Sequence, residues 1–218
     1  HGNQPDITRS KESAENFERE LKALIDSHFN SPSIIMWVIY NEGWGQWDTP
    51  RMTEWATKYD PTRLINQASG WTDRGGGHVH DMHAYPGPNS PKPTEQRAAV
   101  LGEFGGLGLG VEGHSWAPKS AWGYRKIATP EALTREYVKL LVRTYQLIDD
   151  PGLSAAIYTQ ITDVESEVNG LLSYDRKVVK MDVDKVADAN RGKAPPPPQY
   201  KIIVPASRRE GQTWRYVT

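Results

Sequence analysis

The sequence contains no cysteine among its 218 residues. This absence excludes disulfide bonds, thiolate metal sites and thiol nucleophiles, so a metal ion would need histidine, aspartate or glutamate as ligands. It also removes the usual indicator of an oxidising compartment, and the sequence leaves the localisation unknown.

An excess of one charge and long apolar segments are lacking as well. The 26 basic and 27 acidic residues give a net charge of −1, which creates no field that would attract nucleic acid or an anionic membrane. No apolar run reaches about 18 residues, and the opening HGNQPDITRS does not have the basic-then-apolar order of a signal peptide. We therefore expect neither nucleic acid nor a membrane as a partner.

Phenylalanine is scarce, with 3 copies beside 8 tryptophans and 10 tyrosines. Aromatic side chains with a polar edge suit protein cores, and they also suit clefts in which sugar rings stack. The composition alone leaves both uses open.

Amphipathic helices alternate with short apolar strands along the chain. Apolar residues recur at helical spacing in three segments, and continuous apolar runs, typical of strands buried on both faces, separate them. The predicted helices cover residues 11–30, 49–60 and 129–149, and the predicted strands cover residues 34–40, 64–69, 81–85, 98–104 and 153–164. This alternation predicts an α/β fold with a parallel sheet.

The composition changes after residue 193. Four consecutive prolines, Pro195 to Pro198, cannot continue a helix or a central strand and predict an extended spacer. The stretch that follows resumes strand-like chemistry but is too short to bury a core. We expect a domain over residues 1–193, a proline-rich linker over 194–199, and the start of a further β domain or a tail over 200–218.

Two of the predicted strands end in a glutamate. IIMWVIYNEG ends at Glu42, and AAVLGEFGG ends at Glu103; the carboxyl ends of parallel strands meet at one edge of a sheet, where active sites lie. A buried carboxylate costs several kcal/mol unless it is paired. Either each glutamate pairs with an arginine such as Arg51, Arg74 or Arg97, or the two form the acid and nucleophile used on glycosidic bonds.

Five segments together resemble the catalytic domain of glycoside hydrolase family 2, which includes β-galactosidases, β-glucuronidases and β-mannosidases. They are PSIIMWVIYNEGWG, DPTRLINQASGW, DMHAYPGP, VLGEFGG and YTQITDVESEVNGLLSYDR. The resemblance spans residues 15–192 and implies a (β/α)8 TIM-barrel domain, present in part as strands four to eight with their helices. It also implies that the configuration at the anomeric carbon is retained.

The same resemblance assigns roles to four side chains. Glu42 would be the acid/base and Glu103 the nucleophile. Asn41 would bind the sugar 2-hydroxyl, and Tyr85 would hold the nucleophile's carboxylate through its hydroxyl. Retention requires the two carboxyl groups to lie about 5 to 5.5 Å apart.

Further substrate contacts are expected near the strand ends. His83 would bind substrate or the end of its strand, and Gln160 belongs to the stretch where the family commonly has a tryptophan beneath the sugar. Trp44 and Trp47 follow the acid in a loop, where they either stack on sugar rings or pack against the next helix.

Two patterns resemble cofactor motifs. GHVHDMHAY holds three histidines, but in an extended segment His78 and His80 share one face and His83 lies on the other. The glycines from Gly108 to Gly113 match GxGxxG, yet no helix is predicted to begin there. We therefore predict no metal and no cofactor.

An acidic cluster follows the last predicted strand. Asp163, Glu165 and Glu167 could bind a divalent cation, or they could form ion pairs with Arg176 and Lys177. We expect the ion-pair network.

By this resemblance the first three barrel strands precede the sequence. Five strands of an eight-stranded closed barrel leave two unpaired edges, which a second copy of the chain or the missing barrel half would cover. Two functions follow: a β-galactosidase-like retaining hydrolase of terminal β-linked sugars, or a non-catalytic carbohydrate-binding or structural fragment. Carbohydrate is the expected ligand of both.

Overall fold

The computed structural model describes residues 5–193, 208–209 and 212–213. The helices are α1 (Lys11–His28), α2 (Thr49–Tyr59), α3 (Pro130–Asp149) and α4 (Val183–Asn190), with a 3-10 turn η1 at Pro118–Ser120. The strands are β1 (Met36–Asn41), β2 (Leu64–Ser69), β3 (Val79–Ala84), β4 (Ala98–Gly105), β5 (Leu107–Gly108), β6 (Arg125–Lys126), β7 (Leu153–Thr159), β8 (Arg208–Arg209) and β9 (Gln212–Thr213). None of the described helices is long and apolar enough to span a membrane.

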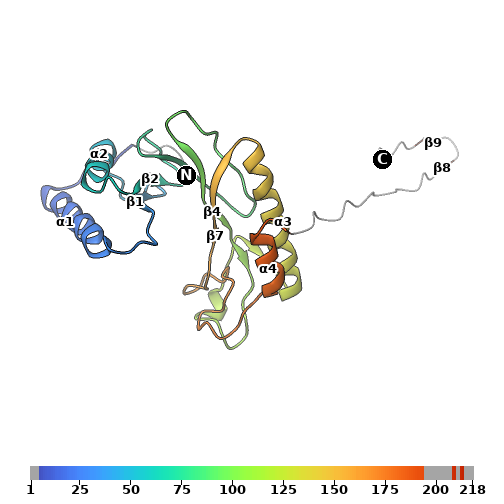
Figure 1. Cartoon of the computed structure of the whole chain (residues 1–218). Helices are drawn as coiled ribbons and strands as arrows, with labels where there is room; N and C mark the ends of the chain where they lie inside the picture. The colour runs from blue at the N-terminus through green and yellow to red at the C-terminus, as the bar shows by residue number, and fades with distance from the viewer. Residues whose placement is uncertain (1–4, 194–207, 210–211, 214–218) are drawn as a thin grey trace.

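The longer strands are parallel. β1 pairs with β2, and β3, β4 and β7 form a second sheet in that order. β2 lies beside β3, because the backbone N–H of His78 donates to the carbonyl of Ile65 at 2.8 Å. The parallel α/β arrangement predicted from the sequence is thus confirmed, with the strands in chain order (Figure 1).

The helices cover the sheet in two groups. α1 and α2 pack on β1 and β2 around a core that includes Ile25, Trp37, Met52 and Ile65. α3 and α4 pack beside β4 and β7 around a second core centred on Phe104, Leu133 and Leu147, and Figure 1 shows the two groups at opposite ends of the row of strands.

Capping residues fix where the helices begin. The side chains of Ser10 and Thr129 accept hydrogen bonds from Ser13 N and Ala132 N, and Pro130 occupies the first turn of α3, as expected at helix N-termini. The periodic segments predicted as helices are therefore found within two residues of their expected ends.

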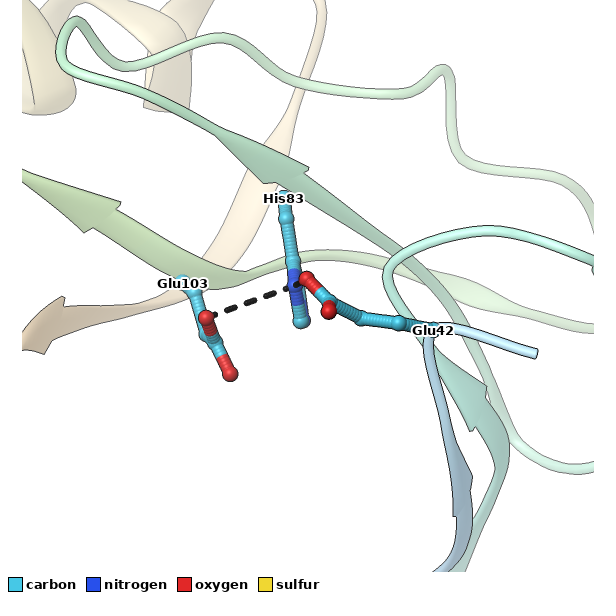
Figure 2. Close-up of side chains that lie close together, drawn as sticks. All are labelled: Glu42, His83 and Glu103. Carbon is cyan, nitrogen blue, oxygen red and sulfur yellow. Dashed lines mark hydrogen bonds and ion pairs between the residues drawn. The ribbon is translucent and has the colours of Figure 1, made fainter. Parts of the chain in front are cut away.

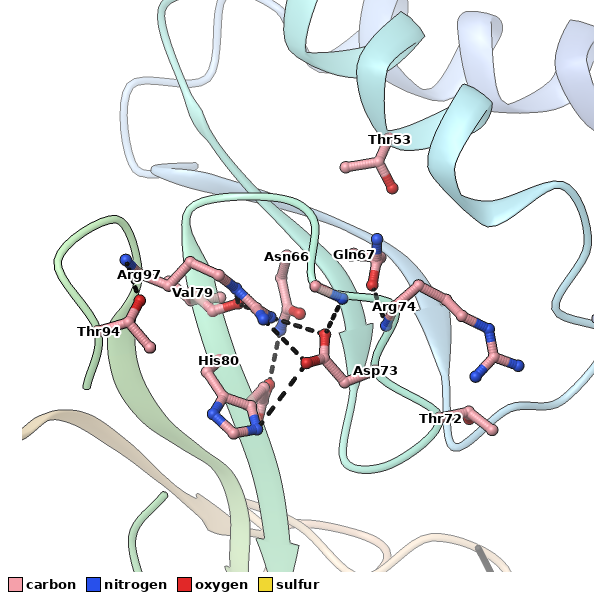
Figure 3. Close-up of polar contacts among 12 residues, drawn as sticks. Thr53, Asn66, Gln67, Thr72, Asp73, Arg74, Val79, His80, Thr94 and Arg97 are labelled. Atoms are coloured by element: carbon pink, nitrogen blue, oxygen red, sulfur yellow. Dashed lines mark hydrogen bonds and ion pairs between the residues drawn. The ribbon is translucent and has the colours of Figure 1, made fainter. Parts of the chain in front are cut away.

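Arg97 anchors the connection between β2 and β3 (Figure 3). Its guanidinium binds the Asp73 carboxylate through two hydrogen bonds of 2.7 and 2.8 Å, and it also donates to the carbonyl of Val79. Burial acts to raise the pKa of Asp73, but the hydrogen bonds from Arg97 lower it below its usual value. This link holds the segment after β2 against the start of β3 and β4.

Some elements differ from the sequence prediction. The predicted strand 153–164 ends at Thr159, because the chain then turns into isolated bridges, among them one between Thr162 and Leu172. α4 and the short strands β5 and β6 were not predicted. The linker predicted over 194–199 lies outside the described residues, and of residues 200–218 only the antiparallel pair β8–β9 is described; the three-part domain division stays a prediction.

Candidate functional site

The carboxyl ends of β1, β3 and β4 bring the two predicted catalytic glutamates and Tyr85 together. Glu42 follows β1, Tyr85 follows β3, and Glu103 lies two residues before the end of β4. His83 of β3 is in register with Glu103 of β4. The parallel pairing therefore places the histidine directly beside the glutamate.

His83 lies between the two glutamates (Figure 2). Its Nδ1 atom is 2.9 Å from Oε1 of Glu42 and 3.4 Å from Oε2 of Glu103. One oxygen of each carboxylate and Nδ1 all lie within 4.8 Å of one another. The imidazole is fully buried, whereas the side chains of Glu42 and Glu103 are 20% and 30% exposed, so the two glutamates are accessible to solvent and the histidine is not.

Tyr85 holds the second carboxylate. Its hydroxyl donates a hydrogen bond to Oε2 of Glu103, and its ring stacks on Tyr124 with centroids 3.9 Å apart. Burial and the hydrogen bond to Glu103 both raise the pKa of Tyr85. The phenol therefore keeps its proton and remains a donor throughout the physiological pH range.

The backbone at Glu42 adopts a left-handed conformation, with φ of 54°. Residues with a side chain rarely adopt this conformation, and such strain is typical of functional sites. The Glu42 N–H donates to the carbonyl of Ser69 at the end of β2, at 2.8 Å. This bond ties the turn at Glu42 to the neighbouring strand.

A buried polar group supports His83 from behind. Its Nε2 is 2.7 Å from the hydroxyl of Ser69, and that hydroxyl donates to Asp81 Oδ2 at 3.0 Å. Asp81 also accepts from Asn66 Nδ2 at 2.6 Å and from the Gly102 N–H at 2.7 Å. The sequence did not indicate Ser69 or Asn66, since neither lies near a glutamate in the chain.

A third carboxylate, that of Glu167, lies near the pair. Glu167 bridges to Trp122 through the backbone, and its side chain accepts from Asn169, which in turn accepts from Gln160. Burial raises the pKa of Glu167, and the charges of Glu103 and Glu42 add to the rise against the hydrogen bond from Asn169. Glu167 was noticed as part of an acidic cluster, but its approach to this site was not predicted.

Tyr124 is a further group that sequence reasoning missed. Burial raises its pKa, and so do the charges of Glu167, Glu42 and Glu103. Tyr124 therefore lies within electrostatic reach of three carboxylates, and no pattern in the sequence links it to them.

The two predicted loop tryptophans have different environments. Trp44 is 77% exposed in the turn after Glu42. Trp47 packs edge-on against Phe17 of α1, and the guanidinium of Arg51 lies over its ring. Trp47 thus has the packing role that was the alternative to sugar stacking, whereas Trp44 is free to stack, and Asn41 is exposed beside it.

The arginines considered as partners of the glutamates bind other acids. Arg97 pairs with Asp73, and Arg74 pairs with Asp6 at 3.1 Å. Arg51 pairs with Glu18 and Asp48. Structural pairing with these arginines therefore does not explain the glutamates at the strand ends.

The histidines of GHVHDMHAY have separate partners. His78 Nδ1 accepts from the N–H of Ile65, and His80 lies 4.0 Å from Asp73. Within the described residues, the one group with the spacing of a metal site is Glu42, His83 and Glu103. An ion there would occupy the carboxylate pair itself, and the prediction that no metal is bound stays a prediction.

The expected ion pairs of the acidic cluster at 163–167 are corrected by the structure. Asp163 pairs with the buried Lys180 at 2.6 Å, and Lys177 lies near Asp175. Arg176 and Lys177 were expected as partners because they are close in sequence, but the backbone turn at Arg176, with φ of 60°, is followed by a return of the chain that brings Lys180 inside.

The fold and the site define a class of protein: a partial parallel α/β barrel with two carboxylates at the carboxyl ends of its strands. Residues 4–85 match the family described as glycosyl hydrolases family 2, TIM barrel domain. Over these residues the chain is similar to the TIM-barrel domain of glycoside hydrolase family 2, and its parallel α/β fold agrees with that domain type. A search of curated proteins found no match.

Three solved structures of similar fold are described as β-glucuronidases. An FMN-binding β-glucuronidase from Faecalibacterium prausnitzii L2-6 is 19% identical with a TM-score of 0.57, over 87% of this chain and 33% of that chain. The apo β-glucuronidase 3 of Bacteroides uniformis is 13% identical with a TM-score of 0.54, over 77% of this chain and 26% of the other. A second Faecalibacterium prausnitzii β-glucuronidase is 15% identical with a TM-score of 0.52, over 82% and 34%.

These likenesses confirm the predicted fold class. The chain is of the α/β TIM-barrel type, and it spans about a third of the length of the first structure that it matches. At identities below 20% the likeness concerns the fold, so substrate and activity are argued from the residues below.

Proposed function

We propose that this chain carries the catalytic carboxylate pair of a retaining glycoside hydrolase that acts on terminal β-linked sugars. The observation that supports this most strongly is the approach of one Glu42 oxygen and one Glu103 oxygen to within 4.8 Å. This separation suits direct attack by one carboxylate on the sugar, whereas an inverting enzyme needs about 6.5 to 9.5 Å to admit a water molecule.

The proposed reaction has two steps. Glu103 attacks the anomeric carbon and forms a glycosyl ester, while Glu42 gives its proton to the departing oxygen. Glu42 then takes a proton from the water that attacks the same carbon, and Glu103 is released as a carboxylate. Tyr85 would hold Glu103 in the attacking position through its hydroxyl.

Asn41, Trp44 and Gln160 are the proposed substrate contacts. Asn41 and Trp44 are exposed next to Glu42, and Gln160 is fixed by its bond to Asn169 at 2.7 Å. The exposed indole would stack on a sugar ring, and the amide of Asn41 would bind the 2-hydroxyl.

The charge around the site favours a neutral sugar. Glu42, Glu103 and Glu167 are close enough for their charges to act on one another, and a uronic acid would add a fourth carboxylate. Like charges at short range disfavour one another in a partly buried site. We therefore place this chain with β-galactosidase-like enzymes in its substrate, although the structures of similar fold are named β-glucuronidases.

The assay compares aryl β-galactosides with aryl β-glucuronides. The parent chain should hydrolyse the galactoside faster, and Glu103→Gln and Glu42→Gln should each lose at least about 10²-fold in rate. Glu112→Gln, a change at an exposed glutamate in the loop after β5, is the matched control and should keep the parent rate. A rate that survives both site substitutions would exclude the assigned mechanism, and a preference for the glucuronide would exclude the neutral sugar.

A non-catalytic sugar-binding fragment is the second candidate. It is favoured by apolar side chains that lie uncovered on the outermost long strands, with Val38 of β1 48% exposed and Ile157 of β7 51% exposed. A wall left open at these strands would let the carboxylates shift, and a displacement of about 1 Å can cost about a hundredfold in rate. Sugar binding without hydrolysis by the parent chain would support this candidate, and a dimeric mass in solution would indicate that a second copy covers the strands.

A further inference from the structure

We propose that Asp81 and Ser69 fix the imidazole of His83 with its hydrogen on Nε2, so that Nδ1 and the Glu42 carboxyl hold one proton between them. Asp81 and Ser69 would then be positioning residues that act on Glu42 through His83. This inference rests on the proposed function, because it assigns the group that prepares the acid for that reaction.

The direction of the hydrogen bonds follows from Ser69. A hydroxyl has one hydrogen, and Ser69 donates it to Asp81 Oδ2 at 3.0 Å. The 2.7 Å contact between Ser69 Oγ and His83 Nε2 must then be donated by the histidine. Nε2 therefore carries a hydrogen, and Nδ1 is left as the atom that gains or loses one.

Asp81 is built to act as an acceptor. It is 4% exposed, and besides Ser69 its two oxygens accept from Asn66 Nδ2 and the Gly102 N–H. Burial raises the pKa of Asp81, and the three donors oppose that rise. Three donors converging on one carboxylate are the arrangement expected for an ionised acceptor.

Two glycines leave the space that this group requires. A Cβ at Gly70 would lie 2.9 Å from His83 Nδ1, and a Cβ at Gly102 would lie 2.3 Å from an oxygen of Asp81. Both distances are shorter than ordinary contacts. The two glycines thus allow the backbone to approach His83 and Asp81 closely, as expected if these two side chains have a fixed arrangement.

The distances indicate that His83 shares the proton with Glu42 and not with Glu103. Nδ1 is 2.9 Å from Glu42 and 3.4 Å from Glu103, and the nearer oxygen of Glu103 already accepts from Tyr85. With Nε2 occupied, Glu42 either donates to a neutral Nδ1 or accepts from a protonated one, and both arrangements contain one proton.

The shared proton would serve the acid step. Without the Nε2 contact, a neutral imidazole could place its hydrogen on Nδ1 and stabilise Glu42 as a carboxylate, which cannot donate to a departing oxygen. With Nε2 fixed, a neutral His83 accepts from Glu42 and keeps it protonated. The edge-on contact of Trp71 with the imidazole, at 5.5 Å between centroids, holds the ring plane in place.

The test reads the hydrogen position directly, without activity. Long-range ¹⁵N–¹H spectra of the chain with ¹⁵N-labelled histidine distinguish Nε2–H from Nδ1–H, and His83→Gln identifies the signals of His83. We expect the neutral form of His83 to carry its hydrogen on Nε2, with Nδ1 as the atom that titrates. A neutral form with hydrogen on Nδ1 would overturn the proposal.

Two serine variants locate the cause. Ser69→Ala should shift the neutral form of His83 toward Nδ1–H, and Ser69→Thr, which keeps the hydroxyl, should restore Nε2–H. His114, which pairs with Asp175 at 2.9 Å, provides an internal control and should not change. An unchanged Nε2–H population in a folded Ser69→Ala chain would overturn the role of Ser69.

Leaving-group dependence supplies a kinetic readout that a purely structural role would not move. Ser69→Ala should lower kcat/KM about tenfold for a phenyl glycoside, the order of one hydrogen bond, and much less for a dinitrophenyl glycoside, which needs no acid. An inactive chain with Nε2–H would refute the proposed function and leave this inference standing. An active chain whose neutral His83 carries its hydrogen on Nδ1 would support the proposed function and overturn this inference.

Discussion

The buried ammonium of Lys180 gives the most demanding test of how the acidic segment is held. Its side chain is fully buried, and Nζ donates to Asp163 Oδ1 at 2.6 Å, to the Leu109 carbonyl at 2.9 Å and to the Val168 carbonyl at 3.0 Å. Burial lowers the pKa of Lys180, and the Asp163 carboxylate opposes that change. The ammonium therefore depends on these three acceptors.

Lys180→Met should lower the free energy of unfolding by about 3 to 5 kcal/mol, the range for removing one partner of a buried ion pair. The methionine fills a similar volume, so most of the loss comes from the Asp163 carboxylate, which is 1% exposed and retains one hydrogen bond, from the Gly170 N–H at 2.8 Å. Urea unfolding followed by far-ultraviolet circular dichroism measures the change.

Two further variants separate charge from packing in this prediction. Lys177→Met, at a side chain that is 75% exposed, should leave the unfolding midpoint unchanged. Adding Asp163→Leu to Lys180→Met should recover a large part of the loss, because both charges are then gone. A loss below about 1 kcal/mol for Lys180→Met, or no recovery in the double variant, would refute the reasoning.

Three further predictions concern the site and the sheet. Tyr85→Phe should lower kcat/KM about 10²- to 10³-fold on an aryl β-galactoside, the usual effect of removing a donor to a reacting oxygen, and an unchanged rate would refute its role. Burial acts to raise the pKa of Asp60, but hydrogen bonds from the hydroxyl of Thr62, the indole of Trp37 and the guanidinium of Arg63 lower it to about 2. The ionised carboxylate should therefore contribute fully to stability above pH 4, and this contribution should be lost as the pH falls toward 2. Asp60→Asn should accordingly weaken the fall in melting temperature at acid pH. Gly102→Ala should destabilise the chain by about 1 to 3 kcal/mol, because its Cβ would meet the Asp81 carboxylate at 2.3 Å, whereas Gly87→Ala, with open space around it, should melt like the parent.

The helices and strands could be predicted because their signals are local. Apolar spacing and capping residues determine α1 and α3 within two residues of their ends, and the apolar run before Glu42 predicts β1. α4 was missed because it has eight residues and one fully buried side chain, Ala189. Too few apolar positions repeat in it for the helical spacing to be recognised.

The carboxylate pair could be predicted because a residue at the end of a parallel strand has a known place. The residues that surround the pair could not be predicted from the sequence. Ser69 and Asp81 meet His83 only after β2 and β3 lie side by side, and Glu167 approaches from a segment more than sixty residues beyond Glu103. Sequence order contains no signal for such contacts.

The two tryptophans show the same limit within one loop. Trp44 and Trp47 are three residues apart, yet one is exposed and the other packs on Phe17. By its place in the sequence either could have stacked on sugar, but Phe17 of α1 packs against Trp47. Long-range packing therefore determines which aromatic side chain remains open.

The covalent intermediate provides the most direct test of the central claim, that Glu103 is the nucleophile of a retaining hydrolase. The chain would be incubated with a 2-deoxy-2-fluoro-β-galactoside that has a good leaving group, and the peptides would be mapped by mass spectrometry. We predict one sugar attached to Glu103, and none on a Glu103→Gln variant. Attachment at Glu42 or Glu167, or turnover of a β-galactoside without any labelling, would contradict the account.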